Sequence, residues 1–371
     1  MVNTYLSYQL ITRDLAKSID RVEAQPGVQR DTAYYLANIG KVKSIDDFLK
    51  DDRLYRYAMK AHGLETMSYA KAFIKKALTE GVSDPNSFAN KLTDKRYAEF
   101  VKSFNFAAMG EITTVYTKAQ HEAVSNYLNQ VSLEGGNPQS KAVQDESNYY
   151  LANISKVKSI DEFMANDRLY AFAIKAYGIE SSINNKDMMR KVLEGGIRDP
   201  NSFANSMIDR KYATFAAAFD FEAHGENATI YNPAQQPAVA KYMRQTLEED
   251  AGVQNEGVRL ALYFERKATD IKNFYDILAD PALAKVARTA LGLPDSFAAS
   301  DIDRQAKLFD EKLNIDDFTD PEKLGKFLTR FTSLWEVSNS TSSQPSIAIL
   351  YQPVELGIST NTLLAIQQMK R

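Results

Sequence analysis

The chain of 371 residues contains no cysteine. This absence excludes disulfide bonds, thiolate zinc sites, iron–sulfur clusters and cysteine nucleophiles. Only 16 glycines and 11 prolines are present. A sheet-rich fold needs more turn-forming residues than this, so the composition favours helices joined by short connections. Stability must therefore come from the packing of helices.

An excess of basic residues is also missing. The 45 Lys and Arg residues are mixed with 48 Asp and Glu residues, which gives a net charge of −3. A general nucleic-acid-binding protein carries a basic excess or a basic stripe, so we expect no nucleic-acid partner. No run of 18 or more apolar residues occurs, so we expect no integral membrane segment.

The first residues, MVNTYLSYQLITRDL, do not resemble an ordinary secretory signal. Such a signal has a basic segment followed by an apolar one, and neither is present here. We therefore expect a protein that is cytoplasmic as synthesised. Export by a route that needs no cleaved signal peptide is the alternative.

Motifs that carry chemistry are absent as well. The three histidines, His62, His121 and His224, have no metal-binding spacing, and nucleotide-binding glycine loops, a serine elbow and a calcium loop are missing. Adjacent carboxylates point in different directions on a helix, so we interpret them as caps and solvated faces. We predict no catalytic, cofactor-binding or metal-binding residue, no cofactor, and a protein that is not an enzyme.

A duplicated phrase is the strongest signal that is present. YYLANIGKVKSIDDFLKDDRLY at residues 34–55 recurs 115 positions later as YYLANISKVKSIDEFMANDRLY at 149–170, with 17 of 22 positions identical. Residues 84–111 and 199–226 match at the same offset, with 16 of 28 identical. We interpret this as duplication of a folding unit, and two copies of one binding site as the alternative.

A third and weaker copy follows. Residues 270–294 resemble residues 159–180, and residues 324–331 repeat the aromatic spacing of residues 97–104. The terminal units of repeat arrays are commonly atypical, because one face meets water in place of a neighbour. The sequence therefore contains two clear units and a degenerate third.

Local patterns within each unit are helical. Ser44 and Ser159 are each followed three residues later by an acid, which predicts a capping box and a short helix. Residues 54–61 then carry apolar side chains at positions i, i+3, i+4 and i+7, and Gly63 is suited to end that helix. We interpret the aromatic stripe at 97–104 as core. The predicted fold is all-α, a multihelical array of two clear tandem repeat units plus a degenerate third.

These observations divide the chain into six segments. We expect an amphipathic N-terminal helical segment at 1–27, repeat unit 1 at 28–142, repeat unit 2 at 143–257, a degenerate repeat unit 3 at 258–337, a flexible linker at 338–345, and an apolar C-terminal tail with a terminal helix at 346–371. Both ends have apolar faces that are suited to protein partners. The predicted partner-binding residues are Leu15, Ile19, Val22, Ile347, Leu350, Leu363, Leu364 and Ile366.

Four stretches together resemble a known family. They are the N-terminal MVNTYLSYQLITRDL, the phrase YYLANIGKVKSIDDFLKDDRLY, the run YAKAFIKKALTEGVSDPNSFAN and the later LGKFLTRFTSLWEVSN. The family is the alphaproteobacterial domain of unknown function 1217, and the resemblance covers nearly the whole chain. It implies an all-α repeat fold and supplies no catalytic residues. Its members are often encoded beside flagellar genes, which implies a flagellum-associated role.

Three functional hypotheses follow. The first is a non-enzymatic structural or adaptor protein of the flagellum, namely an axial component, an export substrate or an assembly factor, with flagellar proteins as partners. The second is a cytoplasmic helical-repeat scaffold or chaperone-like protein that binds a peptide in the groove between repeat units. The third is an enzyme of unknown class, which a deep polar pocket would support.

Overall fold

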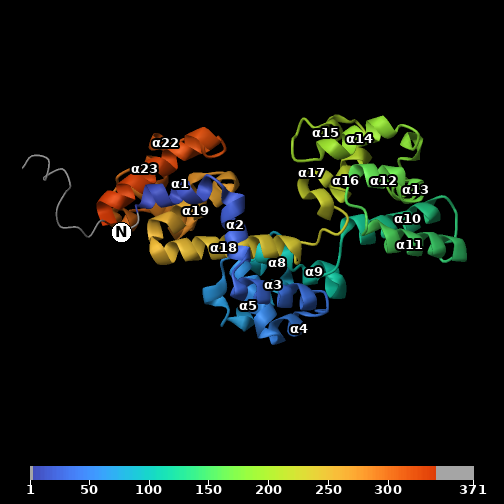
Figure 1. The fold of residues 1–371 in the computed structure, drawn as a ribbon, viewed down its shortest axis with the longest axis horizontal. Coiled ribbons are helices and arrows are strands. Elements are labelled where there is room, and N and C mark those ends of the chain that lie inside the picture. The colour runs from blue at the N-terminus through green and yellow to red at the C-terminus, as the bar shows by residue number, and fades with distance from the viewer. Residues whose placement is uncertain (1–2, 340–371) are drawn as a thin grey trace, which may run out of the picture. The chain divides into compact units, whose positions relative to one another are not determined.

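The computed structural model describes residues 3–339, and every regular element in that range is a helix (Figure 1). The predicted all-α repeat fold is therefore confirmed. The chain forms two compact units, one of Met1–Leu10 with Gln254–Arg371 and one of Ile11–Val253. The predicted tail residues Ile347, Leu350, Leu363, Leu364 and Ile366 lie outside the described residues.

The Ile11–Val253 unit contains both clear repeats. Helix α2 (Leu15–Glu23) precedes the first repeat. That repeat consists of α3 (Pro26–Ile39), α4 (Ile45–Lys50), α5 (Asp52–Ala61), η1 (Glu65–Met67), α6 (Lys71–Glu80), α7 (Phe88–Lys91), α8 (Arg96–Ser103), α9 (Phe106–Met109) and η2 (Gly110–Ile112), followed by η3 (Lys118–Glu122) and α10 (Ala123–Leu133). The second consists of α11 (Lys141–Ile154), α12 (Ile160–Ala165), α13 (Asp167–Ala176), η4 (Glu180–Ser182), α14 (Lys186–Gly195), α15 (Phe203–Ser206), α16 (Lys211–Ala218), α17 (Phe221–His224) and η5 (Gly225–Asn227), followed by α18 (Gln236–Gln254). The order of helices thus recurs at the period of the duplicated phrase. The exact segment boundaries proposed from the sequence stay predictions.

The helix ends follow the predicted local signals with one difference. Ser44 Oγ accepts a hydrogen bond from the backbone N–H of Asp47 at 3.0 Å, and Ser159 Oγ accepts one from that of Glu162 at 3.2 Å. The reciprocal bond of the predicted capping box, from the backbone N–H of the serine to the acid, forms in neither repeat; in the second repeat Glu162 accepts from Lys158 N. Gly63 ends α5 with φ of 66°, a left-handed conformation that glycine adopts without strain.

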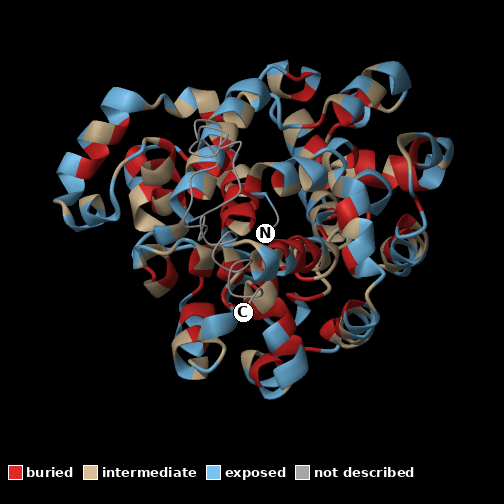
Figure 2. Ribbon diagram, turned by 60° about the vertical axis from the view of Figure 1, so that its left-hand side comes forward, coloured by how far each residue is buried: buried red, intermediate tan, exposed pale blue. Residues whose placement is uncertain are grey.

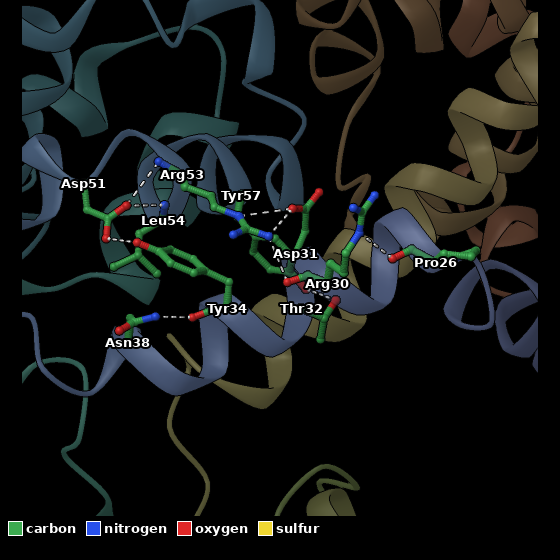
Figure 3. Close-up of polar contacts among 10 residues, drawn as sticks. All are labelled: Pro26, Arg30, Asp31, Thr32, Tyr34, Asn38, Asp51, Arg53, Leu54 and Tyr57. Atoms are coloured by element: carbon green, nitrogen blue, oxygen red, sulfur yellow. Dashed lines mark hydrogen bonds and ion pairs between the residues drawn. The ribbon is translucent and has the colours of Figure 1, made fainter.

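The duplicated phrase ties the start of α5 to α3 (Figure 3). Tyr34 Oη donates a hydrogen bond of 2.9 Å to Asp51, whose other carboxylate oxygen accepts from the backbone N–H groups of Arg53 and Leu54. The Arg53 guanidinium also lies 2.8 Å from Asp31 on α3. The second repeat reproduces the ion pair with Arg168 and Glu146 at 2.9 Å. Arg53 and Arg168, which are identical in the two copies, therefore make equivalent ion pairs with an acid of the preceding helix.

Each repeat forms its own aromatic core, and each core is completed by a helix that follows the other repeat. The first core contains the buried residues of α3–α9 together with Ala234, Ala238 and Tyr242, which belong to α18 and the turn before it. The second core contains the buried residues of α11–α17 together with Ala119 and Ala123, at η3 and the start of α10. Figure 1 shows α10 beside α11 and α13. The two repeats thus exchange helices.

Equivalent contacts hold the exchanged helices. Tyr242 stacks on Tyr57 with ring centroids 3.8 Å apart, and Tyr127 stacks on Phe172 at 4.0 Å. Two ion pairs add to this at equivalent positions, Lys60 with Glu249 at 2.8 Å and Lys175 with Glu134 at 2.6 Å. Buried residues line the inward faces of the helices throughout (Figure 2). The exchange makes the two repeats one interlocked body, which the sequence did not reveal.

The other unit contains the degenerate third copy. Its elements are α19 (Glu256–Lys267), η6 (Ala268–Asp270), α20 (Phe274–Ala279), α21 (Pro281–Ala290), η7 (Asp295–Ala299), α22 (Ile302–Lys312), η8 (Ile315–Phe318) and α23 (Pro321–Asn339), with most of α1 (Thr4–Thr12). Tyr263 Oη donates to Asp280, which caps α21 as Asp51 caps α5. This shared contact identifies α19–α21 as a copy of α3–α5. Helix α23 packs against α21 and α19. The core of this unit is therefore completed by a helix of the same unit.

Candidate binding cavity between the two repeats

A cavity of about 320 Å³ lies between the two repeats of the Ile11–Val253 unit. This volume is at the lower end of the range for ligand sites, roughly 300–1,000 Å³. Its lining consists mostly of equivalent pairs, 115 positions apart: Lys102 and Ala217, Ser103 and Ala218, Asn105 and Asp220, Met109 and His224, Thr113 and Ala228, Tyr116 and Tyr231, and Lys118 and Pro233, together with Ile197 and Asn232. The cavity therefore lies where equivalent segments of the two repeats meet.

The crossing connections that lead into the exchanged helices hold this region together. Gln120 Nε2 donates 2.8 Å to the carbonyl oxygen of Thr229, and the equivalent Gln235 Nε2 donates 2.7 Å to that of Thr114. Asn232 Nδ2 donates to the carbonyl oxygens of Thr113 and Tyr116, at 3.0 and 2.7 Å. Backbone groups at the crossing are thus satisfied from the opposite repeat, which fixes the walls of the cavity.

Each of the two threonines at this crossing also bonds back to its own repeat. Thr114 Oγ1 donates 3.0 Å to the carbonyl oxygen of Val42, and Thr229 Oγ1 donates 2.9 Å to that of Val157. Val42 and Val157 lie in the duplicated phrase, between its first and second helices. The phrase is therefore connected to the cavity through one threonine in each repeat.

The two halves of the lining differ in charge. The first repeat contributes Lys102 and Lys118, where the second has Ala217 and Pro233. The second contributes Asp220, where the first has the neutral Asn105. Among the equivalent pairs of lining residues, only Tyr116 and Tyr231 are identical in the two repeats. A symmetric backbone thus presents cations on one half and an anion on the other, an arrangement suited to an asymmetric ligand.

The titratable groups of the cavity are set by burial and by their partners. His224 stacks on Tyr231 with ring centroids 3.5 Å apart, and burial lowers the pKa of His224. Burial raises the pKa of Tyr231. Both rings are therefore neutral at pH 7, so the charges of the lining are those of the two lysines and Asp220. Asp220 also accepts a hydrogen bond from Ala223 N and so caps α17.

Asn105 stands out among the polar lining residues. Its Oδ1 is buried and has no hydrogen-bond partner among the described residues. A buried acceptor without a partner costs roughly 1–3 kcal/mol. This cost falls on the folded protein itself, because the oxygen has almost no accessible surface through which a ligand could donate to it.

The residues predicted to bind partners lie elsewhere. Leu15, Ile19 and Val22 are on α2, where Val22 is 3% exposed in the first core and the other two pack against that core. In this structure the apolar face of α2 contacts the protein's own repeat. A role for these three residues in binding a partner stays a prediction.

The sequence reasoning missed the cavity because its lining residues carry no motif. A usable signal was available in the aligned copies, since the duplicated segments differ in charge at positions 102 and 217, and at 105 and 220. Within residues 3–339, no three His, Asp or Glu side chains gather in a way that could hold a metal ion. In the same range, no helix has both the length and the apolar character required to cross a bilayer.

Comparison with known proteins agrees with this architecture. Residues 61–175 and 176–324 match the model of the family described as protein of unknown function (DUF1217). The chain belongs to the DUF1217 family. It is similar to the crystal structure of protein AGR_C_984 from Agrobacterium tumefaciens, with 38% identity over 91% of this chain and 94% of that chain and a TM-score of 0.55. No curated protein matches the chain.

The DUF1217 segments agree in period with the repeats. They begin at Ala61 and Ala176, which are equivalent positions at the ends of α5 and α13. The lining from Lys102 to Lys118 falls in the first segment, and the lining from Ile197 to Pro233 falls in the second. Each of the two DUF1217 segments therefore supplies one half of the cavity.

Proposed function

We propose that this DUF1217 protein is a non-enzymatic structural or adaptor protein that binds a segment of a partner protein in the cavity between its repeats. The observation that carries the proposal is the arrangement of charge around the cavity. Tyr116, Tyr231 and Met109 supply apolar surface, while lysines lie on one half and Asp220 on the other. An extended or helical peptide with one large apolar side chain and polar neighbours complements such a site.

The exposure of the two lysines favours a macromolecular ligand. Lys102 and Lys118 are exposed while they also line the cavity, so they lie at its rim. Neither forms an ion pair with another described residue. A rim cation contributes most to a ligand that extends beyond the cavity, because charged pairs at a rim steer association and set orientation. An acidic residue beside the apolar anchor of the partner would meet these lysines.

The test is to fill the cavity without disturbing the fold. Ala217→Trp places an indole in the cavity, and Ala142→Trp on the exposed face of α11 is the matched control. We expect proteins that co-purify with the natural chain from its own cells to be lost with Ala217→Trp. They should be retained with Ala142→Trp and with a chain that ends at residue 345. Retention with Ala217→Trp at unchanged helix content would refute the cavity as the site.

The biological setting that we propose is the flagellum. Its support is the family resemblance, together with a sequence that contains no cysteine. A strain that lacks the gene should swim poorly or build abnormal filaments, and the protein should be found with basal bodies or among secreted proteins. Normal filaments and normal swimming, with the protein in neither fraction, would refute the flagellar role. The hypothesis of a scaffold protein outside the flagellum would then stand.

A further inference from the structure

Helix α1 exposes an apolar face that carries no charge. Leu6 is 64% exposed and Leu10 is 70% exposed, and these two residues are four positions apart, so they share one face of the helix. The sequence of α1, TYLSYQLIT, contains no charged side chain. Surface helices normally carry charged residues on the solvent side. The outer face of α1 therefore has the character of a contact surface.

The opposite face of α1 is already anchored. Thr4 and Tyr8 are buried, and Glu336 accepts hydrogen bonds from both Thr4 N, at 2.8 Å, and Thr4 Oγ1. Asn255 Nδ2 donates 2.9 Å to the same hydroxyl group. The Glu336 carboxylate lies at the N-terminus of α1, where it also interacts favourably with the helix dipole. The first turn of α1 is thus fixed to the last turn of α23, and its leucines remain on the outside.

The chain that follows α23 supplies an occupant of matching chemistry. Residues 359–369, STNTLLAIQQM, are uncharged like α1, and Leu363 and Ile366 are spaced to share a helical face. Packing two uncharged segments together desolvates no charge, which removes the main cost of burying a surface helix. The remaining side chains of both segments are mostly Ser, Thr, Asn and Gln, which suit the edge of such a contact.

The position of the two segments makes the contact local. Because Glu336 holds Thr4, the chain leaves α23 within one turn of the start of α1. Helix α1 is nine residues long, or roughly 13 Å. The 19 residues from 340 to 358 can span up to roughly 60 Å when extended, far more than is needed. A short tether also gives a high effective concentration, which favours docking within one chain over docking between chains.

We propose that residues 359–369 dock as an amphipathic helix on the Leu6–Leu10 face of α1. The N-terminal and C-terminal segments of the chain are then paired in the free protein, through a surface separate from the cavity between the repeats. The proposal does not depend on the function assigned to that cavity.

Disulfide trapping tests the proposal directly, because the chain has no cysteine of its own. Leu6→Cys combined with Ile366→Cys should form an intramolecular disulfide under mild oxidation in dilute solution. Ile302→Cys combined with Ile366→Cys is the control, since Ile302 is another exposed apolar residue of the same unit. Equal yields for the two pairs, or disulfide-linked dimers as the main product, would overturn the proposal.

Hydrogen exchange gives a second and independent measurement. In the full chain the amides of α1 should be protected, and a chain that ends at residue 345 should lose that protection while α23 keeps its own. Loss in α1 alone supports the docked tail. Unchanged exchange of α1 in the shorter chain would overturn it, whether or not the trapped disulfide forms.

Discussion

Tyr35 Oη donates a hydrogen bond of 2.6 Å to the carbonyl oxygen of Ala234, which lies 199 positions further along the chain. The equivalent Tyr150 donates one of 2.6 Å to the carbonyl oxygen of Ala119. Both tyrosines are fully buried. Each bond joins the second-to-last turn of its repeat's first long helix to the start of a helix that follows the other repeat. These two bonds mark the points at which the exchanged helices enter the cores.

Removal of the hydroxyl group of Tyr35 or of Tyr150 should weaken the packing of the exchanged helix against the core that it completes. Tyr35→Phe leaves the buried carbonyl oxygen of Ala234 without this donor, which should lower the free energy of unfolding by about 1–3 kcal/mol. Tyr150→Phe should have a similar effect on the other core. Tyr34→Phe is the matched control, because its hydroxyl group bonds to Asp51 near the surface, and the change should cost about 0.5 kcal/mol or less. Urea denaturation measures all three, and equal effects for positions 34 and 35 would contradict the prediction.

A single repeat separated from its partner should dimerise. The fragment of residues 26–138 lacks Ala234, Ala238 and Tyr242, which complete the first core. It retains Ala119, Ala123 and Tyr127, which occupy the equivalent positions of the second core. Two copies can therefore exchange their α10 helices and reproduce the native contacts, as in domain swapping. Size-exclusion chromatography with light scattering should show a helical dimer.

A folded monomer of the same fragment would contradict that prediction. It would show that α10 can fold back onto the repeat that precedes it. Tyr127→Ala provides a further check, since removal of a ring from a core contact typically costs about 3–5 kcal/mol. That change should shift the fragment toward monomer or unfolded chain.

The helices themselves could be predicted from local sequence, and the exchange could not. Ser44, Gly63 and the apolar spacing of residues 54–61 act within one or two turns, so their effects are visible in a short window. Helices α10 and α18 share inward residues at equivalent positions, Ala123 with Ala238 and Tyr127 with Tyr242, so the local pattern does not show which core each helix joins. Their partners are decided by the path of the connections, and this path is a tertiary property that periodicity does not encode.

The candidate cavity was hidden for a related reason. Lys102, Lys118 and Tyr116 carry no local signal of a binding site, because their neighbours across the cavity come from the other repeat. The apolar face of α2 shows the opposite case. Val22 had the pattern of a partner-binding residue, and the structure places it in the protein's own core. An amphipathic pattern identifies a buried face but not the surface that buries it.

Glycine at position 81 should be required by both conformation and space. Its φ is +70°, and a Cβ atom there would lie 2.7 Å from Cβ of Ala107. We expect Gly81→Ala to lower the free energy of unfolding by about 1–3 kcal/mol. Gly27→Ala is the control, because a Cβ at this position in α3 meets nothing within 4 Å. That change should be neutral or stabilise by up to about 1 kcal/mol, and a comparable loss at both positions in urea denaturation would count against the argument.

Stability should fall in mild acid because of two histidines. Burial lowers the pKa of His121 and of His224 below the ordinary value of 6.5. The unfolded chain then takes up protons near pH 6.5 while the folded chain does not, so their contribution is fully present above that pH. It is lost as the pH falls from the unfolded value through the lower folded value.

The repeats supply natural replacements with which to test this. Position 121 corresponds to Gln236, and position 224 corresponds to Met109, so His121→Gln with His224→Met places in each repeat a residue that the other already accommodates. The natural chain should lose urea resistance between about pH 7.5 and about pH 5.5, a window above the ordinary titration of most carboxylates. The double variant should lose clearly less. An identical pH dependence of the two proteins would show that these half-buried imidazoles are not the groups that take up the protons on unfolding.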